Sequence, residues 1–212
     1  MKENISSQLA TSLGINSSEP NKAVAKLCIK NPKLLEDINK NFSGKDEKLI
    51  ADSAEVMTEV SNEHPELVVK FAACLIPFIK HKYTRARWEA MHALANLSKI
   101  SPEIIESLLP DLQEIIEKDK STIVRDHATS AISIYAGTGA KAAALAFPLM
   151  LEILNIWKEK QAARVMTGML DVLKLQKGFR KDIQKVVDEY KDSDRGVAKK
   201  AALKLEKALT KI

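Results

Sequence analysis

Cysteine is scarce in this sequence, and its apolar runs are short. The two cysteines, Cys28 and Cys74, lie in apolar helical contexts, so we expect buried thiols and no disulfide framework of the kind that supports small secreted proteins. The longest apolar run, 142–151, has 10 residues, about half of what a membrane-spanning helix needs. The opening residues, MKENISSQLATSLGI, lack the apolar core of a secretion signal. These absences predict a protein with no membrane span and a cytoplasmic location.

Aromatic residues are few, at 5% of the chain, and the common motifs of catalysis and cofactor binding are missing. The sequence contains no Gly-x-Ser-x-Gly nucleophile motif and neither of the phosphate-binding patterns Gly-x-x-x-x-Gly-Lys-Ser/Thr and Gly-x-Gly-x-x-Gly. The histidines do not form the three or four convergent ligands that zinc requires; they are His64, His81, His92 and His127. We therefore expect no catalytic residue, no metal and no cofactor, and we interpret the protein as not an enzyme.

Positive charge is concentrated at the C-terminal end. The chain has 33 Lys and Arg against 28 Asp and Glu, a net charge of +5. Residues 174–212 hold 12 basic and 6 acidic residues, which leaves 21 basic and 22 acidic residues for the rest of the chain, a net charge of −1. A protein that follows nucleic-acid phosphates along its length would spread its basic residues more evenly. Nucleic acid is therefore the less favoured partner.

One helical pattern recurs along the chain. Residues 121–135, STIVRDHATSAISIY, place apolar or small side chains such as Val124 and Ala131 at spacings of three and four, which is typical of one helix face. The pattern Val-Arg-x-x-Ala-x-x-Ala-Leu returns upstream and, more loosely, downstream. Its first Ala position recurs at intervals of 39, 38, 37 and 36 residues, at Ala51, Ala90, Ala128, Val165 and Ala201. Such a period indicates stacked two-helix repeats.

The helix before each patterned helix adds a second signature. Three of these preceding helices contain a proline after an apolar pair, namely Pro77, Pro110 and Pro148. This combination, with Asp and Ser in the turns at 119–124 and 192–197, resembles the HEAT repeat family over roughly residues 32–210. The resemblance implies an all-α fold, an α-α superhelix of about six helical-hairpin repeats that forms a single domain over residues 1–212. We place an irregular leading repeat at 1–31 and further repeats at about 32–60, 65–99, 102–136, 141–175 and 178–211.

Two arginines, Arg87 and Arg125, occupy the Arg position of the pattern. They resemble the internal ladder arginines of the HEAT family. The resemblance implies that each bonds to an Asp or to a helix-end carbonyl in the adjacent repeat, with Asp119 as one partner.

The second helix of each pair lines the concave face in this architecture, so the residues opposite the Ala positions are candidates for binding. Across the repeats these positions change from apolar to mixed polar to basic, which suits a protein or peptide partner better than a uniform polyanion. Trp88 stands out because exposed Trp is enriched among interface hot spots, although packing against a neighbouring repeat is the plainer interpretation. The candidate partner-binding residues are Trp88, Glu89, His92, Asn96, His127, Arg164, Lys199 and Lys200.

These observations favour a non-catalytic scaffold that binds a protein or peptide on its concave face. The alternative is a DNA-binding protein similar to the bacterial glycosylases that remove alkylated bases, some of which resemble HEAT stacks of this length. The aromatic and basic groups for that activity would be Trp88, Arg125, Trp157 and Arg164. Those glycosylases also use a carboxylate near the aromatic residue. One helical turn after Trp88 this sequence has His92 and no carboxylate, and Glu89 and Asp126 are alternatives by position only. A third hypothesis is that nucleic acid or another acidic surface binds the C-terminal lysines Lys199, Lys200, Lys204, Lys207 and Lys211.

Overall fold

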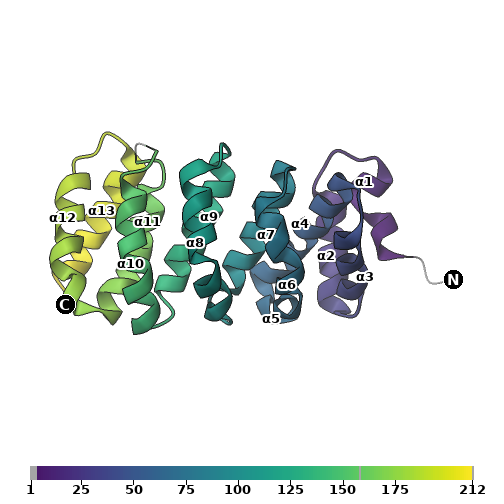
Figure 1. Cartoon of the computed structure of the whole chain (residues 1–212), viewed down its shortest axis with the longest axis horizontal. Helices are drawn as coiled ribbons and strands as arrows, with labels where there is room; N and C mark the ends of the chain where they lie inside the picture. The colour runs from purple at the N-terminus through teal and green to yellow at the C-terminus, as the bar shows by residue number, and fades with distance from the viewer. Residues whose placement is uncertain (1–3, 158, 212) are drawn as a thin grey trace. The chain divides into compact units, whose positions relative to one another are not determined.

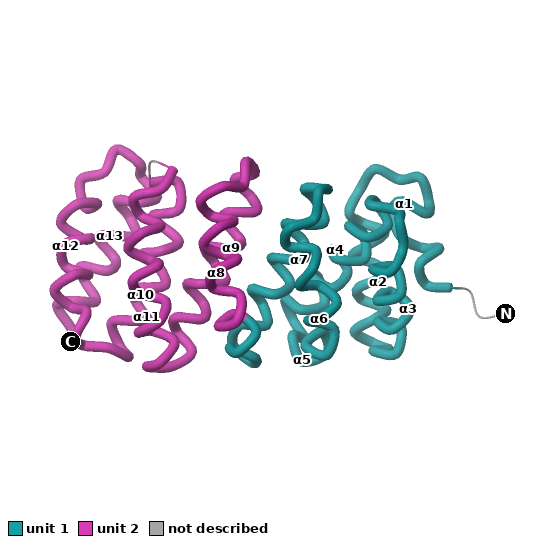
Figure 2. Tube along the Cα trace, viewed as in Figure 1, with its two compact units in different colours: residues 1–104 teal, residues 105–212 magenta. Residues whose placement is uncertain are grey.

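The computed structural model describes residues 4–157 and 159–211, and all the regular elements within those ranges are helices (Figure 1). The prediction of an all-α fold is confirmed. The chain divides into two compact units, residues 1–104 and 105–212 (Figure 2). The boundary falls in the first turn of α8 (Pro102–Lys118). A single domain over residues 1–212 stays a prediction.

Unit 1 consists of an N-terminal helical segment followed by helix pairs. Gly14 ends α1 in the left-handed conformation, with a φ of 67°, and Pro20 lies in the first turn of α2. The α-helices and 3₁₀-helices (η) of this unit are η1 (Ile5–Gln8), α1 (Ala10–Leu13), α2 (Glu19–Lys30), α3 (Leu34–Lys40), η2 (Asn41–Ser43), α4 (Glu47–Glu63), α5 (Pro65–Val68), η3 (Val69–Phe71), α6 (Ala72–Leu75), η4 (Ile76–Lys80) and α7 (Thr84–Leu97).

The first half of the repeat placed at 65–99 is a succession of short α and 3₁₀ turns from α5 to η4, in place of the single helix that a two-helix repeat implies. Pro77 lies in η4 and lacks the N–H that an α-helix would use there. Pro110 and Pro148, by contrast, lie inside the continuous helices α8 and α10 (Ala140–Leu154). A proline alone therefore does not end a helix in this chain.

α4 is the centre of unit 1. It packs most extensively against α7 on one side and against α2 on another, so side chains around its whole circumference are buried. Ile50, Ser53 and Met57 hold the positions opposite the Ala pattern and are buried too. The N-terminal segment thus covers the part of α4 that the repeat pattern assigns to the binding face.

Unit 2 repeats the pairing of helices. α9 packs against α10 and α11, and α13 packs against α11 and α12. Of the recurring Ala positions in the whole chain, Ala51, Ala90, Ala128 and Val165 are fully buried, whereas Ala201 in the last helix is partly exposed. The pattern therefore marks the core, as predicted. The elements that follow α8 are α9 (Thr122–Ala136), α10, α11 (Ala162–Leu175), η5 (Lys177–Phe179), α12 (Arg180–Tyr190) and α13 (Gly196–Leu209).

The two pattern arginines make the same contacts in their respective repeats. Arg87 donates from Nη1 to the main-chain carbonyl of His81, at 2.8 Å, six residues back. Arg125 donates to the main-chain carbonyl of Asp119, also six residues back. These hydrogen bonds lie within each arginine's own repeat, whereas the resemblance implies partners in the adjacent repeat. Each guanidinium therefore satisfies a carbonyl in the turn before its own helix, one of the groups that helix ends leave unpaired.

Candidate functional site

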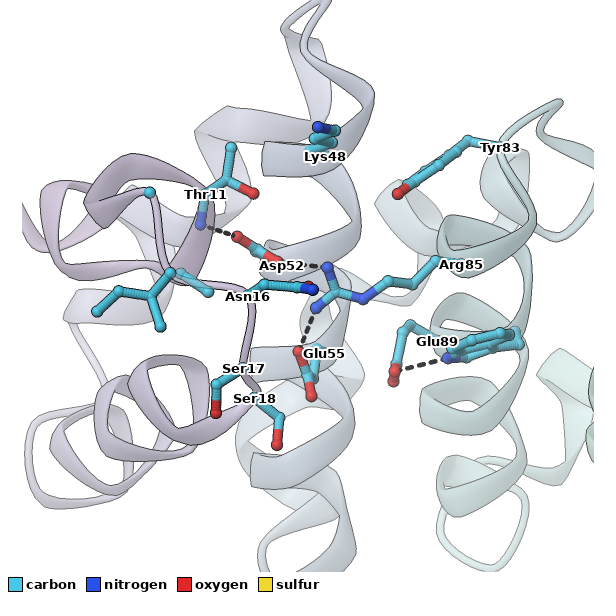
Figure 3. Close-up of a pocket in the computed structure, with 14 residues that line it drawn as sticks. Thr11, Asn16, Ser17, Ser18, Lys48, Asp52, Glu55, Tyr83, Arg85 and Glu89 are labelled. Carbon is cyan, nitrogen blue, oxygen red and sulfur yellow. Dashed lines mark hydrogen bonds and ion pairs between the residues drawn. The ribbon is translucent and has the colours of Figure 1, made fainter.

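Unit 1 contains a polar cavity of about 610 Å³ where the N-terminal segment, α4 and α7 meet (Figure 3). α4 and α7 supply most of its charged groups, and the loop between α1 and α2 supplies hydroxyl and amide groups. Of the predicted binding residues, Trp88 and Glu89 line it. The lining residues are Ala10, Thr11, Gly14, Ile15, Asn16, Ser17, Ser18, Lys48, Asp52, Glu55, Tyr83, Arg85, Trp88 and Glu89.

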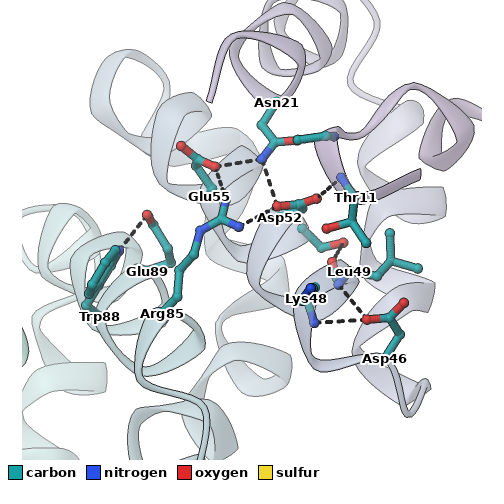
Figure 4. A network of polar contacts seen from close by, with 12 residues as sticks. Thr11, Asn21, Asp46, Lys48, Leu49, Asp52, Glu55, Arg85, Trp88 and Glu89 are labelled. Atoms are coloured by element: carbon teal, nitrogen blue, oxygen red, sulfur yellow. Dashed lines mark hydrogen bonds and ion pairs between the residues drawn. The ribbon is translucent and has the colours of Figure 1, made fainter. Parts of the chain in front are cut away.

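Two carboxylates of α4 share one asparagine from α2. Asp52 and Glu55 are three residues apart, so they lie on the same side of the helix. Asn21 donates from Nδ2 to Asp52 Oδ1 at 3.0 Å and to Glu55 Oε2 at 2.6 Å. Its own carbonyl oxygen accepts the main-chain N–H of Ala10 at 2.9 Å, and Asp52 Oδ2 accepts that of Thr11 at 2.7 Å. These bonds fasten the N-terminal segment to α4 (Figure 4).

Arg85 of α7 bridges both carboxylates. Its Nη1 lies 2.7 Å from Asp52 Oδ1, and its Nη2 pairs with Glu55 Oε2. Burial alone would raise the pKa of Asp52, but the hydrogen bonds from Thr11 and Asn21 and the positive charge of Arg85 outweigh burial and lower it. Charge-assisted bonds of this kind are short and directional. Asp52 and Glu55 are therefore committed to internal contacts.

Glu89 has a different environment. It lies one helical turn beyond Arg85, is 8% exposed, and accepts a hydrogen bond of 2.7 Å from the indole Nε1 of Trp88. Burial raises its pKa to about 7, an effect that the nearby charge of Glu55 reinforces and that the Trp88 bond and Arg85 oppose. Among the described residues, no basic group forms an ion pair with Glu89. The cavity therefore contains one buried carboxyl group without a paired cation.

Two of the other six predicted binding residues form contacts between neighbouring helices. Asn96 of α7 donates to Ser61 and Asn62 of α4, both at 2.9 Å. Arg164 of α11 donates to Asp126 and Ser130 of α9, at 3.2 and 3.1 Å.

The remaining four lie outside the cavity of unit 1. His92 and His127 are partly buried, Lys199 lies 3.8 Å from Asp192, and Lys200 is exposed. The structure thus brings Trp88 and Glu89 together in one cavity.

The residues named for the glycosylase alternative include two that pack against each other in unit 2. Arg125 is buried and its guanidinium stacks on the Trp157 ring. This pairing occupies both side chains within the fold. The alternative itself stays a prediction.

Sequence reasoning missed the polar part of the cavity. Asp52, Glu55 and Arg85 belong to the patterned helices, but the pattern was interpreted from its apolar positions. Acidic residues inside a helix that is buried all round are the one available signal, because buried charges require partners.

Neither a metal-binding cluster nor a membrane-spanning helix occurs in the described residues. Within residues 4–157 and 159–211, no group of three or more His, Cys, Asp or Glu side chains could hold a metal ion. None of the described helices is long and apolar enough to cross a membrane. The cytoplasmic location stays a prediction.

Comparison with known proteins identifies the fold. No protein-family model and no characterised protein sequence matches the chain. Among solved structures, a designed armadillo repeat protein in complex with the peptide (KR)4 matches with a TM-score of 0.69 and 14% identity, over 89% of this chain and 86% of that one. An engineered protein from a structural genomics consortium matches with a TM-score of 0.68 and 14% identity, over 99% and 97%. A structure of computationally designed armadillo repeat proteins for modular peptide recognition matches at 0.66 and 12%, over 97% and 90%.

These similarities establish a helical-repeat fold. At 12–14% identity they concern the fold alone, and they do not distinguish a HEAT from an armadillo arrangement. The chain is thus an all-α helical-repeat protein, as its sequence pattern predicts.

Proposed function

We propose that this protein is a non-catalytic peptide-binding scaffold, and that the cavity of unit 1 receives a basic side chain of the peptide. The observation that carries the proposal is the charge of the cavity. Asp52 and Glu55 share the single guanidinium of Arg85, whereas Glu89 is buried without an ion pair among the described residues. A guest ammonium or guanidinium group at Glu89 would supply the missing positive charge.

The surroundings of Glu89 favour such a guest. Trp88 donates to the Glu89 carboxyl group from the N–H edge of its ring (Figure 4), and Tyr83 lines the same cavity (Figure 3). The bond from Trp88 holds the Glu89 carboxyl group in place, and a guest cation that reaches the ring face of Tyr83 would gain about 0.5 to 2 kcal/mol. Lys48, the other basic residue of the lining, lies near the top of the view on α4, whereas Glu89 lies lower on α7 (Figure 3). Space for a cation therefore remains beside Glu89.

Two further observations support peptide binding over catalysis. The other carboxylates of the cavity are committed to Arg85 and Asn21, so they leave Glu89 without a second free carboxyl group for acid–base chemistry. A structural neighbour with a TM-score of 0.69 is in complex with a peptide of alternating Lys and Arg.

Fluorescence anisotropy with a labelled (KR)4 peptide tests the proposal. We expect binding in the micromolar range near pH 8, and we expect Glu89→Gln to weaken it about tenfold, or about 1.4 kcal/mol. Glu63→Gln is the matched control, because Glu63 is an exposed residue of the same unit that does not line the cavity. Equal effects of the two substitutions, or equal binding of a peptide with Glu in place of Lys and Arg, would refute the proposal.

A further inference from the structure

Unit 2 contains a second cavity, of about 560 Å³, between α11 and α13. Its lining differs in charge from that of the first. Four of the lining residues are lysines and one is an aspartate, and the floor between them is apolar. The lining residues are Thr167, Leu170, Asp171, Lys174, Lys204, Lys207, Ala208 and Lys211.

Helix periodicity gathers the lysines on one side of α13. Lys204 and Lys207 lie three residues apart on one face of α13, and Lys211 follows four residues later, in the turn after the last residue of the helix, Leu209. The opposite face is apolar: Ala202 and Leu205 are fully buried in the packing of α13 against α11 and α12. The core side of α13 therefore fixes the orientation of the lysine side.

The positive charge of this cavity is not neutralised within the fold. Asp171 pairs with Lys174 at 2.8 Å, which cancels the one negative charge of the lining. Lys204, Lys207 and Lys211 are exposed, and none of them forms an ion pair among the described residues. Three ammonium groups thus surround one cavity without counter-charges, an arrangement that attracts anions.

The floor of the cavity indicates which anion fits. Leu170 and Ala208 are partly exposed between the lysines. A polyphosphate backbone would leave this apolar surface wet, and among the described lining residues there is no aromatic side chain on which a base could stack. A peptide segment with carboxylates around an apolar side chain would pair the lysines and cover the floor at once.

We propose that the cavity between α11 and α13 binds an acidic peptide segment, with Lys204, Lys207 and Lys211 as its carboxylate-binding residues and Leu170 as its apolar contact. This site is independent of the cavity in unit 1. It takes a ligand of opposite charge and requires no residue of unit 1.

Anisotropy with a labelled peptide of alternating Glu and Leu tests the assignment in the full chain. We expect wild-type binding with a Kd below about 1 mM at low salt and weaker binding as salt is added. The variant Lys204→Gln, Lys207→Gln, Lys211→Gln should lose at least about tenfold in affinity. The control variant Lys120→Gln, Lys177→Gln, Lys181→Gln removes the same charge from exposed lysines outside the cavity, and it should change the affinity less than about twofold.

Three outcomes would overturn the proposal. Equal losses in the two triple variants would mean that net charge alone attracts the peptide. Absence of wild-type binding at about 1 mM peptide would show that the cavity does not bind acidic peptides. Tighter binding of duplex DNA than of the peptide, lost in the cavity variant, would reassign the lysines to nucleic acid.

Discussion

The guanidinium of Arg125 lies 3.8 Å from the centroid of the Trp157 ring. The indole Nε1 of Trp157 also donates to the main-chain carbonyl of Ile116 at 2.6 Å. Arg125 is 1% exposed, so its charge is removed from water. The aromatic face of Trp157 partly compensates for that loss of hydration. Trp157 adopts a positive φ of 57° to reach this place, a conformation that costs a bulky residue about 1 kcal/mol or more. The contact therefore joins α8, α9 and the turn before α11.

Removal of the ring should destabilise unit 2. Trp157→Ala loses the cation–π contact, the hydrogen bond to Ile116 and the packing area of the ring, and we expect a loss of about 3 kcal/mol in the free energy of unfolding. Trp157→Phe retains a ring and should lose less. Urea unfolding followed by circular dichroism measures both, and a loss below about 0.5 kcal/mol for the alanine variant would contradict this role.

A glycine allows α9 and α11 to approach closely. A Cβ atom added at Gly168 would lie 2.6 Å from Ser133 Cβ and 2.9 Å from Met150 Cε. Gly168→Ala should therefore destabilise the fold by about 1 to 3 kcal/mol despite the better helix propensity of alanine. Gly178→Ala is the control, since no described atom lies within 4 Å of its added Cβ. Equal melting temperatures for the two variants would refute the close approach.

Asp52 should make unit 1 sensitive to acid. Its pKa in the fold is below the ordinary value of 3.8. The stabilisation is therefore complete above about pH 4 and decreases as the pH falls through the folded-state pKa. Asp52→Asn should be less stable than the wild type near neutral pH, because Arg85 loses a charged partner, and the difference should shrink in acid. Urea unfolding at a series of pH values measures this, and a difference that grows in acid would contradict it.

Glu89 should make unit 1 less stable as the pH rises. Its pKa is raised from 4.5 to about 7, so the folded state retains a proton that the unfolded state releases. Stability therefore decreases as the pH rises from about 4.5 to 7, and the full penalty remains above that range. Glu89→Gln keeps an oxygen for the Trp88 bond and carries no charge. It should be more stable than the wild type at about pH 8, by up to about 3 kcal/mol, and nearly equal to it at about pH 4. Unfolding experiments at the two pH values test this, and a stabilisation confined to acid would refute it.

The repeat architecture could be predicted from the sequence because it is a local property. Buried positions such as Ala90 and Ala128 recur at a spacing that any stacked helix pair requires. The cavity of unit 1 could not be predicted from the sequence, since it depends on contacts between residues that are far apart in the chain. Asn21 reaches Glu55 across 34 positions of the chain, and Arg85 reaches it across 30. Apolar periodicity contains no information on such pairs.

Two predictions of surface exposure are wrong for the same reason. Met57 holds a position opposite the Ala pattern, but it is fully buried in α4, which packs against both α2 and α7. The pattern also places Glu89 among the surface contacts, whereas the packing of α4 and α7 buries it. In both cases a neighbouring element decides the exposure of the residue.

The two tryptophans of the chain provide the most direct test of peptide binding in unit 1. The indole N–H of Trp88 lies in the cavity and bonds to Glu89, whereas that of Trp157 is held by Ile116 in unit 2. In ¹H–¹⁵N spectra, titration with the (KR)4 peptide should shift the Trp88 indole signal in a saturable manner and leave the Trp157 signal in place. A shift of Trp157 alone, or no shift of either signal at about 1 mM peptide, would contradict the account.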